Sequence, residues 1–260
     1  MPLSKKQLSA LLDQEQYPLS AKYDPDWVID NEMGPNVLWL TEELCRHMKL
    51  EPGMRVLDMG CGRAMSSIFL AKEFGVQVWA NDLWISATDN YKRICEAGVE
   101  DRVFPIHAEA RALPYADKFF DAIVSLDSFH YYGTDVHYLE FYLLKLLKPG
   151  GQIGIVSPAS PERLPHPLPS YLGDEWYFMN TVEWWRDQWT RNPFIELIHA
   201  ELFPRGWELW IKWQEFLEAS DRRNRPDEVT ELEQLRADSG KHLGFVTMVG
   251  RRTKSKEPQR

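Results

Sequence analysis

The stretch Val56-Leu57-Asp58-Met59-Gly60-Cys61-Gly62 decides the fold of this 260-residue chain. The run from Arg55 to Asp58 carries aliphatic residues without polar alternation, which predicts a strand buried on both faces, as in α/β proteins. Gly60 and Gly62 then allow a tight turn and a close approach of the backbone to a ligand. From residue 64 to residue 74 apolar residues recur at helical spacing. A strand, a glycine turn and a helix predict a nucleotide-type ligand at the mouth of a parallel sheet.

The same stretch argues against a dinucleotide dehydrogenase. That fingerprint has a third glycine where this chain has Met65, and its acidic residue does not precede the turn as Asp58 does. Residues 76–82 are the next expected strand. It ends in Asp82, whose carboxylate can accept hydrogen bonds from both hydroxyls of a ribose.

Further elements follow from the hydrophobic pattern. Strands are expected at residues 102–106, 121–126, 152–156 and 194–203, with an antiparallel last strand at 244–249. A helix is expected at Ser4 to Gln16, followed by an irregular stretch through Trp27. Two more helices are expected after Thr181 and around Trp207 to Leu217.

Five ordered stretches carry a family resemblance over about residues 36–158. They are Val56 to Gly62, Asn81-Asp82, Ala108-Glu109-Ala110 with Leu113-Pro114, Phe120-Asp121, and Leu147 to Gly151. In this order they resemble the class I S-adenosylmethionine-dependent methyltransferases, of the small-molecule type that includes the methyltransferase type 11 and cyclopropane synthase-like groups. The resemblance implies an α/β, Rossmann-like sheet of seven mostly parallel strands, with an antiparallel last strand and helices on both faces.

The resemblance also implies the cofactor, S-adenosyl-L-methionine with S-adenosyl-L-homocysteine as product, and its contacts. It assigns Asp58, Gly60 and Gly62 to the methionine moiety, Asp82 to the ribose, Leu83 to the adenine face, and Glu109 with Ala110 to the adenine edge. Cys61 is expected to fill space in the cofactor turn, and Ser125 and Asp127 complete the expected cofactor contacts. Many members have glycine at the position of Ala64 and aspartate at that of Glu109, so shifted contacts with retained binding are expected.

His130 and Tyr131 are the expected catalytic residues. His130 follows the fourth strand, where an open sheet offers its ligand crevice, and an imidazole with a pKa near 6.5 is suited to take a proton at neutral pH. Tyr131 is expected to orient or stack on the acceptor. The alternative is a half-buried structural histidine that caps the next helix.

The composition of the chain indicates which classes of partner it is expected to lack. The net charge of −9 disfavours nucleic acid, and the basic clusters Arg222-Arg223 with Arg225, and Arg251-Arg252 with Lys254 and Lys256, are local. Three widely spaced cysteines fit reduced thiols, and neither they nor the seven histidines have metal-binding spacing, so no metal is expected. With no apolar run long enough for a membrane span and no signal-peptide pattern, a cytoplasmic protein without stable membrane association is expected.

One domain with four parts is expected. Residues 1–35 form a lid, with Tyr17, Tyr23 and Trp27 either facing the cofactor or packing the segment onto the core. Residues 36–158 bind the cofactor, residues 159–243 continue the core with aromatic-rich substrate-side elements, and residues 244–260 hold the last strand and a basic tail. Seven tryptophans of the third part form core or the wall of an acceptor pocket: Trp176, Trp184, Trp185, Trp189, Trp207, Trp210 and Trp213.

The predicted function is methyl transfer to a small-molecule acceptor. Two alternatives stay open: lipid modification of the cyclopropane fatty acid synthase type, and a protein that binds S-adenosylmethionine without catalysis.

Overall fold

The structure is a computed structural model, and it describes residues 3–220 and 229–254. Its seven strands form one sheet with the order β3-β2-β1-β4-β5-β7-β6. β7 runs antiparallel to both of its neighbours, and the other pairs are parallel, so the predicted α/β fold is confirmed. The strands are β1 (Arg55–Met59), β2 (Gln77–Asp82), β3 (Val103–His107), β4 (Phe120–Leu126), β5 (Leu147–Ala159), β6 (Ile195–Leu202) and β7 (Gly244–Arg252).

Alternate strand residues enter two separate hydrophobic clusters, because successive side chains of a strand point to opposite faces. Val56 belongs to one cluster and Leu57 to the other, and Val124 and Ile123 of β4 divide in the same way. Both faces of the central strands are therefore covered, as the unbroken aliphatic run of β1 predicts.

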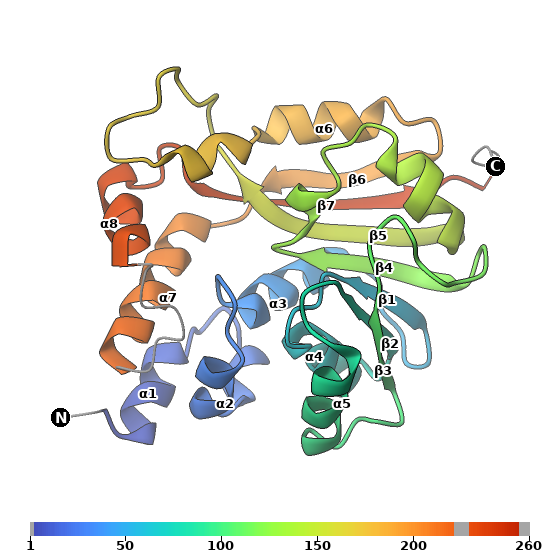
Figure 1. Cartoon of the computed structure of the whole chain (residues 1–260), viewed down its shortest axis with the longest axis horizontal. Helices are drawn as coiled ribbons and strands as arrows, with labels where there is room; N and C mark the ends of the chain where they lie inside the picture. Colours follow the sequence, from blue (N-terminus) through green and yellow to red (C-terminus); the bar gives the residue numbers. More distant parts are fainter. Residues whose placement is uncertain (1–2, 221–228, 255–260) are drawn as a thin grey trace.

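Helices cover both faces of the sheet (Figure 1). On one face lie α3 (Val37–His47), α4 (Met65–Phe74) and α5 (Ala87–Glu96); on the other lie α6 (Val182–Thr190) and the irregular helical segment 139–146. α1 (Lys5–Leu12), α2 (Pro25–Asp30), α7 (Gly206–Ser220) and α8 (Val229–Asp238) gather beyond the end of the sheet where β1, β2, β4 and β5 finish.

The N-terminal segment differs from its prediction in two ways. The first helix ends at Leu12 and not at Gln16, and the stretch expected to be irregular contains α2. α2 begins at Pro25, whose missing N–H costs nothing in a first helical turn, and the Asp24 carboxylate accepts a hydrogen bond from the backbone N–H of Asp26.

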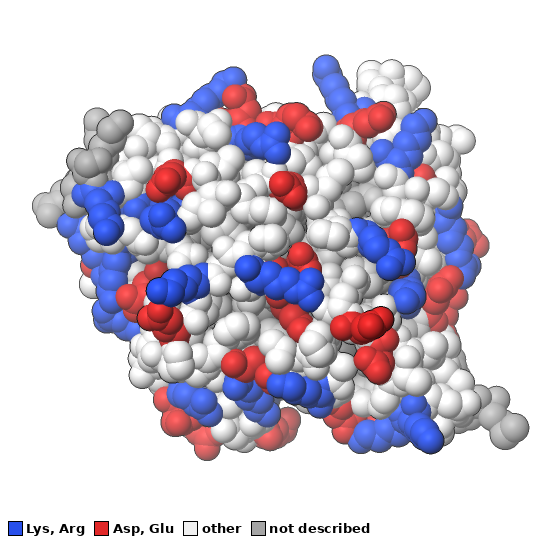
Figure 2. All heavy atoms as spheres, turned by 180° about the vertical axis from the view of Figure 1, so that it is seen from behind, with Lys and Arg blue, Asp and Glu red and all other residues white. Residues whose placement is uncertain are grey.

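Charged side chains of both signs are interspersed over the face turned away in Figure 1 (Figure 2). Within the described residues no helix combines the length and apolarity that a membrane crossing requires. The predicted basic cluster at Arg222, Arg223 and Arg225, and Lys256 of the tail, lie outside the described residues.

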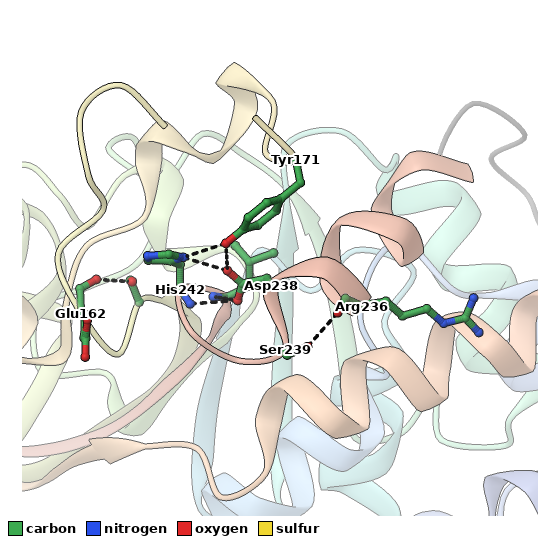
Figure 3. Close-up of polar contacts among 8 residues, drawn as sticks. Glu162, Tyr171, Arg236, Asp238, Ser239 and His242 are labelled. Carbon is green, nitrogen blue, oxygen red and sulfur yellow. Dashed lines mark hydrogen bonds and ion pairs between the residues drawn. The ribbon is translucent and has the colours of Figure 1, made fainter. Parts of the chain in front are cut away.

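A buried polar cluster fastens the proline-rich loop after β5 to the turn between α8 and β7 (Figure 3). Asp238 accepts hydrogen bonds from the backbone N–H groups of His242 and Leu243, both at 2.8 Å, and its other oxygen lies 2.9 Å from Nδ1 of His242. The hydroxyl of Tyr171, which belongs to the loop, donates to the same oxygen at 3.2 Å. The loop is thus held at the end of the sheet where the parallel strands finish.

Candidate active site

A cavity of about 790 Å³ opens at the carboxyl ends of β1, β2, β3 and β4, where a parallel sheet offers its ligand crevice. Its volume lies within the roughly 300–1,000 Å³ typical of small-molecule sites. Asp58 and Ser125 do not line it but lie directly behind its lining. The other predicted site residues do line it: Gly60, Cys61, Gly62, Asp82, Leu83, Glu109, Ala110, Asp127, His130 and Tyr131.

The glycine turn after β1 forms one end of the cavity. Gly60 has φ +68°, and a Cβ at this position would come within 1.9 Å of Oγ of Ser128. The N–H groups of Gly60 and Cys61 both donate to the carbonyl of Asn81, which ties the turn to β2. Burial raises the pKa of the Cys61 thiol well above its ordinary value, so the side chain stays a neutral thiol that fills space.

Asp58 supports the glycine turn from behind. The side chain is fully buried, and one carboxylate oxygen accepts hydrogen bonds of 2.6 Å from the hydroxyls of Ser66 and Ser67 in the first turn of α4. Its other oxygen, Oδ1, has no hydrogen-bond partner among the described residues. Burial raises the pKa of Asp58 to about 6, and the two serine hydroxyls offset part of that rise.

Asp82 joins the loops that follow β1 and β2. Its Oδ2 accepts from the N–H of Gly62 at 2.8 Å, and its Oδ1 accepts from the N–H groups of Trp84 and Ile85 at 2.7 and 2.9 Å. A carboxylate offers about four lone-pair sites, so at least one remains for a ligand. Asp82 therefore shapes the glycine turn in addition to any contact with a ribose.

The loop after β3 supplies Glu109 and Ala110. The Glu109 carboxylate accepts from the N–H of Arg111 at 2.6 Å and pairs with its guanidinium at 3.3 Å, while the carbonyl of Ala110 accepts from the hydroxyl of Tyr138. Leu83, on the loop after β2, is half exposed at the cavity wall. The cavity lining at this end of the sheet therefore combines an apolar side chain with two fixed polar groups.

Ser125 belongs to a buried hydroxyl network under the loop after β4. Its Oγ lies 2.9 Å from the hydroxyl of Tyr132, which lies 2.8 Å from Oγ of Ser128, and the carbonyl of Met59 accepts from both of the latter hydroxyls at 3.1 Å. The network joins β1 to the loop that carries His130. Asp127, the first residue of that loop, has the left-handed φ of +50°.

His130 differs from its predicted state. Only 9% of the residue is exposed, Nδ1 is buried without a hydrogen-bond partner in the described part of the chain, and its ring stacks on that of Phe178 with centroids 4.8 Å apart. Burial lowers the pKa of His130 from its ordinary value near 6.5 to about 4. His130 is therefore a neutral and weak base at pH 7. It also does not cap a longer helix, because it lies inside the short turn Phe129–Tyr131.

A continuous line of rings forms one wall of the cavity. The ring centroid of Trp210 lies 5.7 Å from that of Trp176, which lies 6.3 Å from that of Phe178. The centroid of Phe178 lies 4.8 Å from that of His130. The line continues from His130 to Tyr131 at 4.0 Å and from Tyr131 to Trp84 at 5.2 Å. Of the seven clustered tryptophans, Trp176, Trp210 and Trp213 line the cavity, whereas Trp184, Trp185, Trp189 and Trp207 do not. Trp185 and Trp189 are core residues, and Trp184 and Trp207 are partly buried; the assignment of the three lining tryptophans to an acceptor pocket stays a prediction.

The N-terminal aromatic residues follow the second of the two alternatives, packing onto the core. Tyr17, Tyr23 and Trp27 are absent from the cavity lining and pack among other aromatic rings. The lining comes instead from residues 31–37, where Sδ of Met33 lies 2.9 Å from the Cβ position of Gly62 and the carbonyl of Gly34 accepts from the Trp213 indole at 2.7 Å. The sequence signal near this segment is Asn36, whose side chain caps α3 and so marks where the segment ends.

Comparison with known proteins is consistent with this geometry. Residues 56–151 match the model of a methyltransferase domain. The chain is 32% identical over 117 residues to the 27-O-demethylrifamycin SV methyltransferase of Amycolatopsis mediterranei, covering 45% of this chain and 43% of that protein. It thus spans less than half the length of this curated relative.

Two solved structures share the fold. One is a putative sarcosine dimethylglycine methyltransferase from Galdieria sulphuraria, with a TM-score of 0.69, 17% identity and coverage of 97% of this chain and 92% of that one. The other is the Haemonchus contortus phosphoethanolamine N-methyltransferase 2 in complex with S-adenosyl-L-methionine, with a TM-score of 0.73, 19% identity and coverage of 95% and 60%. Residues 56–151 of this chain therefore match a methyltransferase domain, in a fold that the chain shares with these two structures.

Proposed function

We propose that this chain is an enzyme that transfers the methyl group of S-adenosyl-L-methionine to a small-molecule acceptor. The observation that carries the proposal is the cavity itself, which joins the glycine turn of the methyltransferase domain to an aromatic wall contributed by distant segments. One end suits the cofactor and the other suits an acceptor. A cavity for the cofactor alone would not need the second end.

The cofactor end has groups that fit this ligand. Oδ1 of Asp58 is a buried carboxylate oxygen without a partner in the described structure, and it lies behind the turn where a cationic amino group would be held. Asp82 retains capacity to accept a hydrogen bond from a ribose hydroxyl. Leu83 offers an apolar face for the adenine, and Glu109 with Ala110 offers polar groups for its edge.

Methyl transfer requires the protein mainly to align the acceptor with the methyl group. S-adenosyl-L-methionine brings a methyl group that is already electrophilic, because its sulfonium leaves as a neutral thioether. The aromatic wall positions the acceptor and excludes water, and positioning contributes up to about 7–11 kcal/mol in favourable cases. The proposal keeps His130 and Tyr131 as residues that face the acceptor, with His130 orienting it and not removing a proton at neutral pH.

Isothermal titration with S-adenosyl-L-methionine and S-adenosyl-L-homocysteine tests the cofactor half of the proposal. Asp82→Asn should weaken both affinities about 10- to 150-fold, since charge-assisted hydrogen bonds contribute roughly 1.5–3 kcal/mol. Asp89→Asn, an exposed change on α5 outside the cavity lining, is the matched control. Absence of binding by the unmodified protein would overturn the proposal. Binding without turnover on any acceptor would favour the non-catalytic alternative.

A further inference from the structure

The inner end of the aromatic wall is a corner of two tryptophans. The rings of Trp176 and Trp210 stand nearly perpendicular, at 69° with centroids 5.7 Å apart, and both residues are almost fully buried. Both line the cavity. A corner of this kind presents two aromatic surfaces at an angle to one ligand group.

Gln234 of α8 fixes this corner. Its side-chain oxygen accepts from the indole N–H of Trp176 at 2.6 Å, and its side-chain nitrogen donates to Oε1 of Glu175 at 3.2 Å. The polar edge of Trp176 is thus occupied by the protein, so a ligand can meet only the apolar surface of this ring. The same amide holds the carboxylate of Glu175 beside the ring, and both Glu175 and Gln234 line the cavity.

The charge at this corner is negative. Glu175 is exposed, and no Lys, Arg or His of residues 3–220 or 229–254 forms an ion pair with it. The faces of aromatic rings carry negative electrostatic potential, and a cation placed over a tryptophan gains roughly 0.5–2 kcal/mol. Two indoles and a carboxylate together favour a cationic group over a neutral group of the same shape.

We propose that the methyl acceptor is an amine, and that Trp176, Trp210 and Glu175 bind its nitrogen-bearing end. This assignment rests on the proposed function, because it identifies the acceptor class of the same cavity. Gln234 is a positioning residue, since it acts through Trp176 and Glu175.

The negative potential of this corner suits the positive charge that develops on the acceptor nitrogen during N-methylation. The amine enters as its free base, having released its proton to solvent. Its nitrogen lone pair forms the new N–C bond while the C–S bond breaks and its electron pair stays on sulfur. The positive charge passes from sulfur to the acceptor nitrogen, and the products are neutral S-adenosyl-L-homocysteine and a methylated ammonium ion. Interactions that strengthen as the nitrogen becomes positive lower the barrier.

A hydroxyl acceptor needs a general base, whereas a free amine does not. An alcohol or phenol must lose a proton for methylation to yield a neutral ether, which calls for a base of suitable pKa. Burial lowers the pKa of His130 to about 4, so this imidazole is poorly matched to that task. A free amine can attack without a base in the methyl-transfer step.

The test compares choline with 3,3-dimethylbutan-1-ol, which has the same shape without the charge. Protein saturated with S-adenosyl-L-homocysteine is titrated with each compound by calorimetry, and choline should bind at least about tenfold more tightly. Glu175→Gln and Trp210→Leu should each reduce that preference about three- to tenfold. Glu183→Gln and Trp184→Phe on α6, outside the cavity lining, are matched controls that should leave it unchanged.

The outcomes separate this inference from the function on which it rests. If S-adenosyl-L-homocysteine binds but choline binds no better than its neutral isostere, or not at all, the amine assignment is wrong and the methyltransferase proposal stands. If S-adenosyl-L-homocysteine does not bind, both fail. Each variant must retain the affinity of the unmodified protein for S-adenosyl-L-homocysteine, which shows that it is folded around the cofactor end. Radiolabelled methyl transfer to 2-(dimethylamino)ethanol but not to 3-methylbutan-1-ol would complete the support.

Discussion

Gly60 shows how a single residue defines the cofactor end of the cavity. Its φ of +68° is unfavourable for a side chain, and an added Cβ would also meet Oγ of Ser128 at 1.9 Å. Gly60→Ala should therefore lower the free energy of unfolding by about 2–4 kcal/mol, combining a left-handed backbone with a steric clash. Urea denaturation measures this loss.

Gly53→Ala is the matched control for that prediction. Gly53 also has a left-handed φ, +81°, but nothing lies within 4 Å of its Cβ position. Its loss should be limited to about 1–2 kcal/mol of backbone strain. Equal losses for the two variants would show that the Ser128 contact does not constrain the turn.

Burial shifts the pKa values of His130 and Asp58 in opposite directions, so the two residues predict opposite effects of pH on the unfolding free energy. Burial lowers the pKa of His130 to about 4, so its contribution to stability is present above pH 6.5 and is lost as the pH falls toward 4. Burial raises the pKa of Asp58 to about 6, so its contribution is present below pH 3.8 and is lost as the pH rises toward 6. The two effects oppose each other between pH 4 and 6.

Single variants should separate these two effects. Relative to His130→Gln, the unmodified protein should lose up to about 3 kcal/mol of unfolding free energy between pH 6.5 and pH 4. Relative to Asp58→Asn, it should lose up to about 3 kcal/mol between pH 4 and pH 6. Urea titrations at each pH measure both differences. A difference that stays flat with pH would mean that the residue titrates alike in the folded and unfolded chain.

The positions of the site residues were easier to predict from the sequence than the protonation states of their side chains. Ten of the twelve predicted site residues line the cavity, because the glycine turn and the strand ends fix their place. The pKa of His130 was not predictable, since its burial depends on Phe178, which lies 48 residues further along the chain. Sequence spacing fixes neighbours within an element but not contacts between distant ones.

At the scale of elements, strands were predicted well because burial on both faces leaves an unbroken aliphatic pattern. The seven strands lie where the pattern places them, with shifted ends such as β5, which begins at Leu147 and not at residue 152. Short helices such as α2 depend on a cap and a proline more than on periodicity, so they were missed. The aromatic wall unites several segments, and no local pattern reports that they meet.

The polar cluster of Figure 3 gives an element-scale prediction about the proline-rich loop. Tyr171→Phe removes one hydroxyl from Asp238 and should lower the unfolding free energy by about 1 kcal/mol. Asp238→Ala leaves two backbone N–H groups and a buried imidazole without their acceptor, and should cost about 3–5 kcal/mol.

Urea denaturation of both variants measures the difference, with an unchanged m-value showing that the unfolded state is the same. Arg236→Gln is the control from the same helix, because Arg236 pairs with Glu215 on the surface and should contribute at most about 1 kcal/mol. If Asp238→Ala costs no more than Arg236→Gln, the cluster does not hold the loop.

At the scale of the whole molecule, one cavity draws its walls from the N-terminal segment, the sheet, and both C-terminal helices. This cavity exists only in the folded chain, so a ligand that binds in it should stabilise the folded state. At a concentration 100 times its dissociation constant, S-adenosyl-L-homocysteine should add about 2.7 kcal/mol to the unfolding free energy. For a chain of this size that raises Tm by roughly 5–10 °C.

Scanning calorimetry with and without S-adenosyl-L-homocysteine measures this shift, and 5′-methylthioadenosine provides the comparison. The second compound lacks the amino acid part, so it cannot occupy the end of the cavity beside the glycine turn that the buried Asp58 supports. At equal saturation of their sites the two ligands stabilise alike by linkage; at equal concentration the weaker ligand should give the smaller shift. Equal shifts at equal concentration would show that the Asp58 end of the cavity contributes nothing to affinity, and that the cofactor is held by its nucleoside part alone.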